Sequence, residues 1–183
     1  DSDAVEKAKK IALENEYSLY YPSAENFYLQ TKTIFIDQRL VVCGDNGTMI
    51  DVWAGKQKNG SHIKYTGTGA AFAIIRNTQP AVNLKSPYGV TFKNLIIEGT
   101  ELASHGIKVS DKSNINKAGT DTAAFTISDI YLINFKKGRG LEINWCFMNK
   151  VTNLFTGDCA IGASLNYAHN TTFTGGSFQQ GLL

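Results

Sequence analysis

The second half of the chain carries two sets of side chains whose types could do chemistry together. Glu142 and Asp158 are carboxylic acids, and a pair of carboxyl groups can divide the roles of general acid and of base or nucleophile. His105, Lys108 and Arg139 could instead supply a base and the cations that hold an anionic group. Glu142 and Asp158 are 16 residues apart, and Arg139 lies more than 30 residues after His105 and Lys108, so either chemistry needs a fold that brings distant segments onto one surface.

The spacing of the glycines predicts such a fold. Short segments that begin with Gly and alternate apolar residues recur as GIKVS at 106–110, GLEIN at 140–144, GASLN at 162–166 and GLL at 181–183. The intervals are 34, 22 and 19 residues, and the longest contains the polar stretch DKSNINKAGTDTA, which is typical of a loop insertion. Without that loop the period is about 21 residues, which is too short for a βαβ unit and typical of one coil of a parallel β-helix.

A second row of segments follows nearly the same period. It comprises NLIIEG at 94–99, DIYLIN at 129–134, KVTNLF at 150–155 and NTTFTG at 170–175. Each unit therefore holds two or three short strands separated by Gly, Asn and Asp. We predict an all-β fold in which such coils stack and share one core.

Alternation within the glycine-led strands predicts which side chains face outward. Three pairs should face the core, namely Ile107 and Val109, Leu141 and Ile143, and Ala163 and Leu165. Lys108, Glu142 and Ser164 should then form one outer column, because stacked strands lie about 4.8 Å apart. Asn144 and Asn166 are expected to stack amide on amide at a bend, and each glycine is expected to permit the turn before its strand.

The first residues predict a helix that caps the open end of the stack. Asp3 and Glu6 have the spacing of a capping box, and one helical face carries Val5, Ala8, Ile11 and Ala12. The next segments, SLYYP, FYLQ, TIFI and LVVCGDNG, are short strands broken by turn residues. We therefore divide the chain into 1–87, with the helix and irregular coils, and 88–183, with regular coils of about 20–22 residues. Because QQGLL begins a further coil, we expect a fragment of a longer protein.

Composition limits the kinds of partner. The 183 residues, 43% apolar and 19% charged, suffice for one domain with its own core. The net charge of +2 comes with scattered lysines and argues against a nucleic-acid partner, and no apolar run approaches the ~20 residues of a membrane span. Cys43, Cys146 and Cys159 form no metal-type pair and are expected to be reduced and buried.

The order of these segments resembles the N-terminal part of the pectate-lyase-like right-handed parallel β-helix superfamily, particularly bacteriophage tailspikes and capsule polysaccharide depolymerases. The matching segments are the D-x-x-A helix DSDAVEKAKKIA, the strand LYYP that ends in Pro, FYL, VVCGDNG, and the coils HIKYTGTGAAF and GVTFKNLIIEG. Residues 23–26, SAEN, depart from the short Gly turn that is common in the family. The resemblance implies a right-handed, single-stranded solenoid with an N-terminal capping helix.

The resemblance also implies binding and cleavage of a bacterial surface polysaccharide, either capsule or O-antigen. In this superfamily the sheet of the glycine-led strands often carries the catalytic groove. The groove-facing candidates are then Lys108, Glu142 and Ser164, with His105 and Arg139 from the turns just before their glycines, and Asp158 from the turn before Gly162.

Two mechanisms stay open for such a groove. Hydrolysis would use Glu142 and Asp158, whose carboxyl groups must lie about 5–9 Å apart. β-Elimination would use His105 as base, with Arg139 and Lys108 holding a uronate. Since no aspartate cluster occurs on the glycine-led strands, we expect no metal and no cofactor.

Aromatic and amide side chains complete the expected site. Trp145, just after the asparagine turn, is a candidate for stacking on a sugar, and Asn144 for binding the substrate. The aromatic residues at coil spacing are expected to stack in the interior, namely Phe125, Tyr131, Phe147, Phe155 and Phe173.

A non-catalytic interpretation uses the same residues. Glu142 would simply pair with Lys108 as a solvated ladder, and His105 would be a turn histidine. The chain would then be an adhesin or fibre segment that binds glycan or supports a trimer. A secreted plant-cell-wall pectinase is a third reading, disfavoured by the missing aspartate cluster. The resemblance implies a homotrimeric parent on a virion tail, synthesised in the cytoplasm of a bacterial host and acting outside it.

Overall fold

The computed structural model describes residues 2–45, 60–75, 88–109 and 122–180. A helix, α1 (Ser2–Glu14), precedes the strands β1 (Leu19–Tyr21), β2 (Tyr28–Gln30), β3 (Ile34–Ile36), β4 (Val41–Gly44), β5 (His62–Tyr65), β6 (Ala70–Ile74) and β7 (Thr91–Glu98). The later strands are β8 (His105–Val109), β9 (Thr122–Ala123), β10 (Thr126–Ile133), β11 (Arg139–Phe147), β12 (Lys150–Cys159), β13 (Ile161–His169) and β14 (Thr172–Gln180). The predicted N-terminal helix and mostly β architecture are therefore confirmed.

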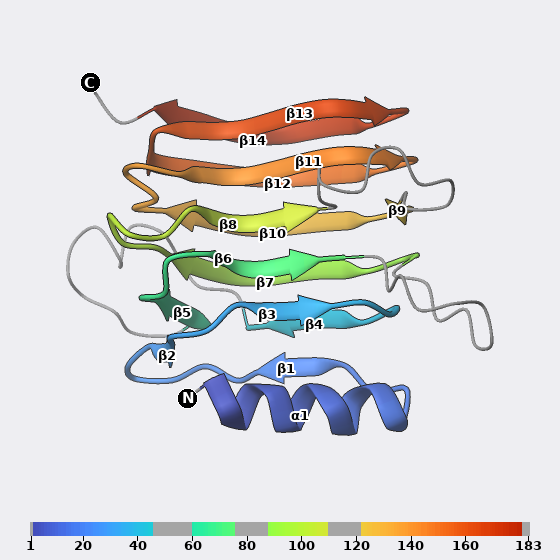
Figure 1. Ribbon diagram of the computed structural model, residues 1–183, viewed down its shortest axis with the longest axis vertical. Coiled ribbons are helices and arrows are strands. Elements are labelled where there is room, and N and C mark those ends of the chain that lie inside the picture. The colour runs from blue at the N-terminus through green and yellow to red at the C-terminus, as the bar shows by residue number, and fades with distance from the viewer. Residues whose placement is uncertain (1, 46–59, 76–87, 110–121, 181–183) are drawn as a thin grey trace.

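The strands form two parallel sheets that lie face to face (Figure 1). The eight-stranded sheet follows the order β1-β4-β7-β10-β12-β14, and β2 and β5 attach beside that path. The six-stranded sheet follows β3-β6-β8-β11-β13, with β9 paired to β11. Each strand thus pairs with a strand from an earlier or later circuit of the chain, and never with its immediate neighbour in sequence.

In-register pairing stacks equivalent side chains into columns. One core column of the eight-stranded sheet contains Leu19, Val42, Phe92, Ile127, Val151 and Phe173. Phe72 of the six-stranded sheet meets Phe92 edge to face, with ring centroids 5.2 Å apart. The inner faces of the two sheets therefore share one apolar core. Removal of this apolar surface from water stabilises the fold.

A column of left-handed residues runs across the eight-stranded sheet. Asn94, Asp129, Asn153 and Gly175 occupy equivalent places in successive strands and have φ of 58°, 54°, 49° and 68°. Asn, Asp and Gly tolerate this conformation best. The predicted second row is wrong after its second member, because Asp129 lies beside Asn153 rather than Lys150.

The glycine-led row is confirmed over Gly106, Gly140 and Gly162, but the reason for the glycines differs from the prediction. They lie within strands, and none has a left-handed φ. A Cβ on Gly106 would come 2.7 Å from the carbonyl oxygen of Gly140, and a Cβ on Gly140 equally close to that of Gly162. Close approach of successive coils, and not a turn, therefore excludes a side chain there. The fourth member, 181–183, lies outside the described residues.

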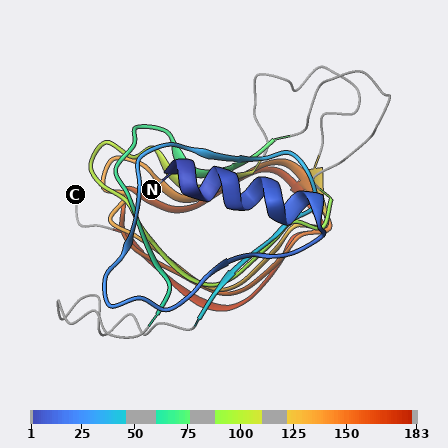
Figure 2. The same cartoon turned by 90° about the horizontal axis from the view of Figure 1, so that it is seen from below.

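Helix α1 lies across the end of the stack (Figure 2). Ala12 is buried in the core cluster, and Val5 and Leu13 pack against it. Ile11 is 47% exposed, and Ala8 is exposed too, so the prediction that these two belong to the buried face is wrong.

The start of α1 also differs from the predicted capping box. The helix begins at Ser2, whose Oγ accepts hydrogen bonds from the backbone N–H groups of Thr31 and Lys32 at 2.8 and 3.0 Å. Asp3 lies inside the first turn, and its carboxylate pairs with Lys32 Nζ at 2.8 Å. Glu6 pairs with Lys9 along the helix. The Ser2 hydroxyl thus ties the helix to the first coil.

Only part of the predicted aromatic interior is found. Phe125 is buried in the core, and Phe173 packs against it. Tyr131 and Phe155 are half-buried and stack on each other at 4.8 Å, with an interplanar angle of 13°. Their strand neighbours on either side are buried, so alternation places this pair on the outer face. Phe147 is half-buried.

Two predictions from composition can be compared with the structure. The three cysteines are free thiols; Cys146 and Cys159 are buried as predicted, whereas Cys43 is only half-buried. Burial raises the pKa of the Cys159 thiol to about 11. Within the described part of the chain, no helix has the length and apolar character needed to cross a bilayer.

Gly140→Ala is expected to lower the free energy of unfolding by about 1–3 kcal/mol, because the added methyl would crowd the Gly162 carbonyl oxygen. Urea denaturation followed by circular dichroism measures the change. Ala160→Ser also adds one heavy atom, but at an exposed bend, and should change stability by less than about 0.5 kcal/mol. Equal stability of Gly140→Ala and wild type would contradict the close approach of the two coils.

Met148 is 58% exposed and has a φ of 57°, so glycine should suit its backbone better than alanine. Met148→Gly is expected to be more stable than Met148→Ala by about 1 kcal/mol, because only the alanine bears the cost of the left-handed conformation. At the exposed strand residue Lys150 the order should reverse, with Lys150→Ala more stable than Lys150→Gly. Thermal denaturation of the four variants tests this, and the same order at both positions would refute it.

Candidate functional site

Glu142 is the centre of the candidate site. The predicted outer column is present, because Glu142 lies in register between Lys108 of β8 and Ser164 of β13. Its strand neighbours Leu141 and Ile143 are fully buried in the core. Although alternation turns Glu142 outward, it is only 6% exposed, which differs from the solvated ladder of the non-catalytic interpretation.

Three donors surround the Glu142 carboxylate. Arg139 Nη1 donates to Oε2, Asn144 Nδ2 donates to Oε1 at 2.7 Å, and His105 Nε2 lies 3.3 Å from Oε2. His105 and Arg139 are paired in register as the first residues of β8 and β11. The prediction that they lie in the preceding turns is therefore wrong, although the predicted gathering of these residues is found.

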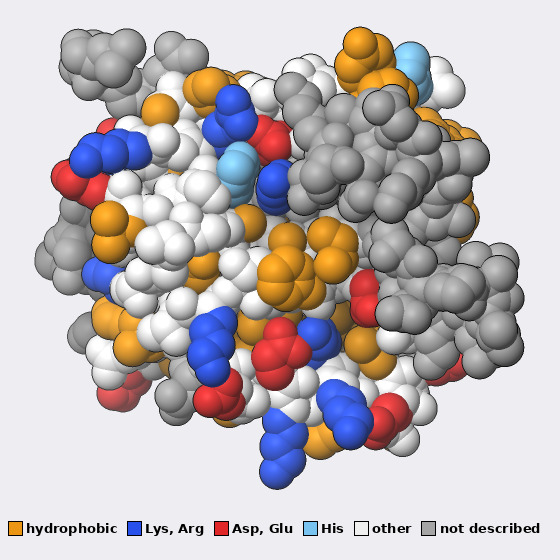
Figure 3. Space-filling view, in the orientation of Figure 1, with side chains coloured by type: hydrophobic (Ala, Val, Ile, Leu, Met, Phe, Trp, Pro, Cys, Tyr) orange, Lys and Arg blue, Asp and Glu red, His pale blue; other side chains and the backbone are white. Residues whose placement is uncertain are grey.

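The cluster extends in both directions through further hydrogen bonds. Ser104 Oγ lies 2.8 Å from His105 Nδ1. Asn166 Nδ2 donates to Asn144 Oδ1 at 2.9 Å, which confirms the predicted stacking of the two amides. The network thus joins residues of three successive coils, and on this face of the molecule a histidine lies beside basic and acidic side chains (Figure 3).

The surroundings shift the pKa values of both titratable partners. Burial, the largest single influence on Glu142, acts to raise its pKa, but the hydrogen bond from Asn144 and the charges of His105 and Arg139 together lower it. Burial lowers the pKa of His105, and the Glu142 charge opposes this only partly. At neutral pH the site therefore holds an ionised carboxylate beside a neutral imidazole.

Asp158 lies apart from this cluster. It belongs to β12 of the eight-stranded sheet, whereas Glu142 belongs to β11 of the six-stranded sheet. Asp158 is exposed and has a φ of 51°, and Asn134, the equivalent residue one coil earlier, has a φ of 63°. This place in a column of left-handed corner residues gives Asp158 an architectural role. Its catalytic role stays a prediction.

Trp145 stacks on Tyr167, an aromatic residue that was not among the predicted site residues. Its ring lies 4.2 Å from that of Tyr167, at an interplanar angle of 19°, and Tyr167 is 61% exposed. Both residues have left-handed φ and follow directly after the stacked Asn144 and Asn166. The sequence could have indicated this pair, because Tyr167 follows Asn166 just as Trp145 follows Asn144. The substrate-binding roles of Trp145 and Asn144 stay predictions.

The eight-stranded sheet carries a second charged cluster that the sequence did not reveal. The buried His62 places Nε2 3.0 Å from Glu98 Oε2. Lys64 Nζ lies 3.8 Å from Glu98 Oε1, and Asn134 Nδ2 donates to the same oxygen at 3.1 Å. The His62 contact is the main reason that the pKa of Glu98 is lowered. Irregular spacing of the early coils hides this pairing from any fixed sequence period.

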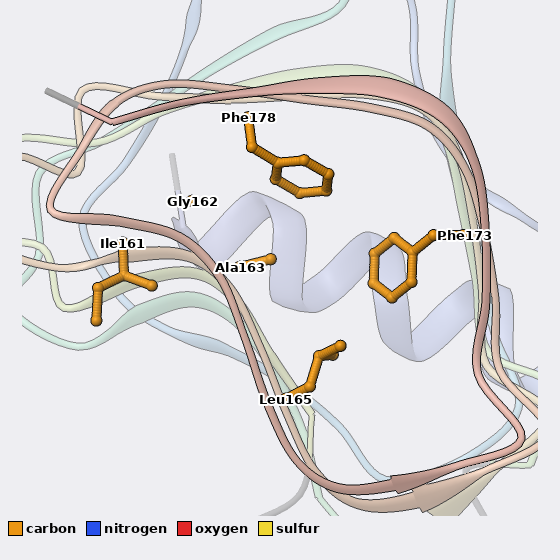
Figure 4. A pocket seen from close by; sticks show the side chains of 6 residues that line it. All are labelled: Ile161, Gly162, Ala163, Leu165, Phe173 and Phe178. Atoms are coloured by element: carbon orange, nitrogen blue, oxygen red, sulfur yellow. The ribbon is translucent and has the colours of Figure 1, made fainter.

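An apolar pocket of about 390 Å³ lies at the last described coil (Figure 4). Its lining comes from β13 and β14, and comprises Ile161, Gly162, Ala163, Leu165, Phe173 and Phe178. Phe173 and Phe178 turn their rings into the space between the two strands. This pocket is the interior of the last described coil, and it offers no polar side chain to orient a sugar.

Metal binding finds no support in the described residues, where no three His, Cys, Asp or Glu side chains gather in a way that could hold an ion.

The chain was also compared with protein-family models, curated proteins and solved structures, and none of the three comparisons found a match.

Acidification is expected to destabilise the fold partly through His105. Its folded pKa lies below the ordinary 6.5, so the stability that neutral His105 contributes is complete above that value and is lost as pH falls through the lowered pKa. Glu142 adds a similar loss below its ordinary 4.5. Urea midpoints across this range should fall less steeply for His105→Gln than for wild type, while the exposed-site control His169→Gln should follow wild type. Identical profiles for wild type and His105→Gln would contradict the burial of a neutral His105.

Proposed function

We propose that the chain is a right-handed parallel β-helix of the pectate-lyase-like type. The support is the in-register parallel pairing of strands from successive circuits, with columns of equivalent residues on both sheets. A capping helix across one end and glycines at the closest approach of coils fit the same architecture. We propose a right-handed coil because connections between parallel strands of one sheet are almost always right-handed.

On this fold we propose a tailspike-type depolymerase segment that binds and cleaves a bacterial surface polysaccharide. The observation that carries the proposal is the joining of His105, Arg139 and Glu142 in one charged cluster on the outer face of a sheet. The outer face of stacked strands can hold an extended polymer along several coils. The stacked pair of Trp145 and Tyr167 follows in the same strands and offers a flat apolar surface to a sugar.

Within this proposal the geometry supports β-elimination better than hydrolysis. A neutral His105 can accept a proton at Nδ1, while Arg139 and Lys108 are cations suited to a uronate carboxylate. Glu142 holds the imidazole through Nε2 and offsets part of the positive charge. Hydrolysis would instead need Asp158, which lies in the other sheet and at a corner position.

The alternative is a non-catalytic protein, namely a glycan-binding adhesin or fibre segment. The homotrimer and the virion tail that the resemblance implies would suit this alternative as well. One observation favours it, namely that donors from the protein itself already surround Glu142. A carboxylate whose acceptors are all used by the protein's own donors does not need a substrate, and joining neighbouring coils is then a sufficient role for it.

Oligosaccharide release from a panel of purified bacterial capsules and O-antigens tests the proposal. We expect release together with the ultraviolet absorbance of an unsaturated uronate, and a loss of about 10²–10⁴-fold in rate for His105→Gln. Lys137→Gln, at an exposed residue paired only with the exposed Glu101 among the described contacts, is the matched control and should retain the wild-type rate. Release without the absorbance would indicate hydrolysis, and binding without release would favour the adhesin.

A further inference from the structure

Ser104 extends the charged cluster through His105 Nδ1, the same ring nitrogen that serves as the base in the proposed glycan cleavage. This half-buried residue precedes β8, and its Oγ lies 2.8 Å from His105 Nδ1. The other imidazole nitrogen, Nε2, lies 3.3 Å from Glu142 Oε2. One histidine ring therefore bridges a hydroxyl and a carboxylate, with one ring nitrogen committed to each.

The direction of these hydrogen bonds follows from the donors around Glu142. Arg139 carries only donors, and Asn144 presents its amide nitrogen, so both carboxylate oxygens act as acceptors. His105 Nε2 must then carry the hydrogen that faces Glu142. In the neutral ring Nδ1 is left as an acceptor, and the Ser104 hydroxyl is the group that donates to it.

We propose that Ser104, His105 and Glu142 form a nucleophile–base–carboxylate relay that hydrolyses acyl esters, with O-acyl groups of a glycan as the substrate class. This activity goes beyond the proposed cleavage of the polymer, because a serine nucleophile acts on an ester carbonyl and not on a glycosidic bond. The roles are those of a Ser-His-acid triad, with the two ring nitrogens exchanged relative to the usual arrangement.

The reaction balances with water as the second substrate. Ser104 Oγ attacks the carbonyl carbon while its proton passes to His105 Nδ1, and the tetrahedral intermediate then expels the sugar alkoxide, which takes that proton. Water next attacks the acyl-serine, His105 again accepts the proton and returns it to Oγ, and the carboxylic acid leaves. Glu142 keeps its negative charge throughout and stabilises the transient imidazolium.

Arg139 contacts both ends of the proposed relay, at Ser104 and at Glu142. Its backbone N–H binds the Ser104 carbonyl oxygen at 2.9 Å, which fixes the residue beside the nucleophile. Its Nη1 is held by Glu142, whereas Nε is buried with no hydrogen-bond partner among the described residues. A buried unpaired N–H is costly, so the Arg139 side chain keeps one donor that the contact with Glu142 does not use.

Labelling with an alkyl fluorophosphonate tests the relay without any glycan. The serine oxygen displaces fluoride from phosphorus, so the intact mass rises by one adduct, and peptide mapping should place that adduct on Ser104. Ser104→Ala should abolish labelling, and His105→Gln should slow it by about 10²-fold or more. Ser128→Ala, at a half-buried serine of the opposite sheet, is the control and should label like wild type.

Hydrolysis of p-nitrophenyl acetate should show the same order of variants, with circular dichroism confirming that each is folded. Absence of an adduct, or an adduct that survives Ser104→Ala, overturns the inference. The outcome is separable from the proposed depolymerase activity. Glycan cleavage by a chain that takes no label would remove the relay alone, and labelling of Ser104 in a chain that cleaves no glycan would remove the depolymerase alone.

Discussion

Parallel, in-register stacking of one circuit of the chain on the next is the constraint from which the rest of the structure follows. Because the strands of neighbouring coils pair largely in register, most side chains lie over one of the same orientation. The inward columns merge into one core, and the outward columns form ladders. Gly106 and Gly140 belong to this constraint as well, since a side chain at either would hold two coils apart.

The same stacking explains how a charged cluster forms from distant segments. His105 and Arg139 are neighbours only because β8 and β11 pair at those residues, and the ring of His105 then reaches Glu142. Burial of an ionised carboxylate without partners would cost several kcal/mol, and Arg139 and Asn144 offset that cost. The satisfied network fixes the imidazole and its hydrogen, as the proposed acid–base chemistry at this histidine requires. The second cluster, of His62 and Glu98, shows that the fold brings titratable side chains of different strands together on either sheet.

Much of this arrangement was accessible from the sequence where the period is regular. The glycine-led row predicted the column of Lys108, Glu142 and Ser164, and the paired asparagines predicted their own stacking. The second row failed because its register depends on left-handed residues such as Asp129 and Asn153, which apolar spacing does not reveal.

Other features depend on packing and could not be read from residue types. The buried face of α1 is rotated away from Ile11, because tertiary contacts decide which side of a short helix is covered. Ser104 was not predicted as a site residue because a serine before a histidine is common. Only the contact between its Oγ and His105 Nδ1 indicates that the two side chains act together. The cluster of His62 and Glu98 was hidden by the irregular length of the early coils.

A double-mutant cycle between His105 and Glu142 tests most directly whether coil stacking joins these two residues into one functional unit. The free energies of unfolding of wild type, His105→Gln, Glu142→Gln and the double variant would be measured at neutral pH. The structure predicts a coupling energy of about 0.5–3 kcal/mol for this pair, and additivity within about 0.5 kcal/mol for His105 with Asp158. Additivity for His105 with Glu142 would contradict the account.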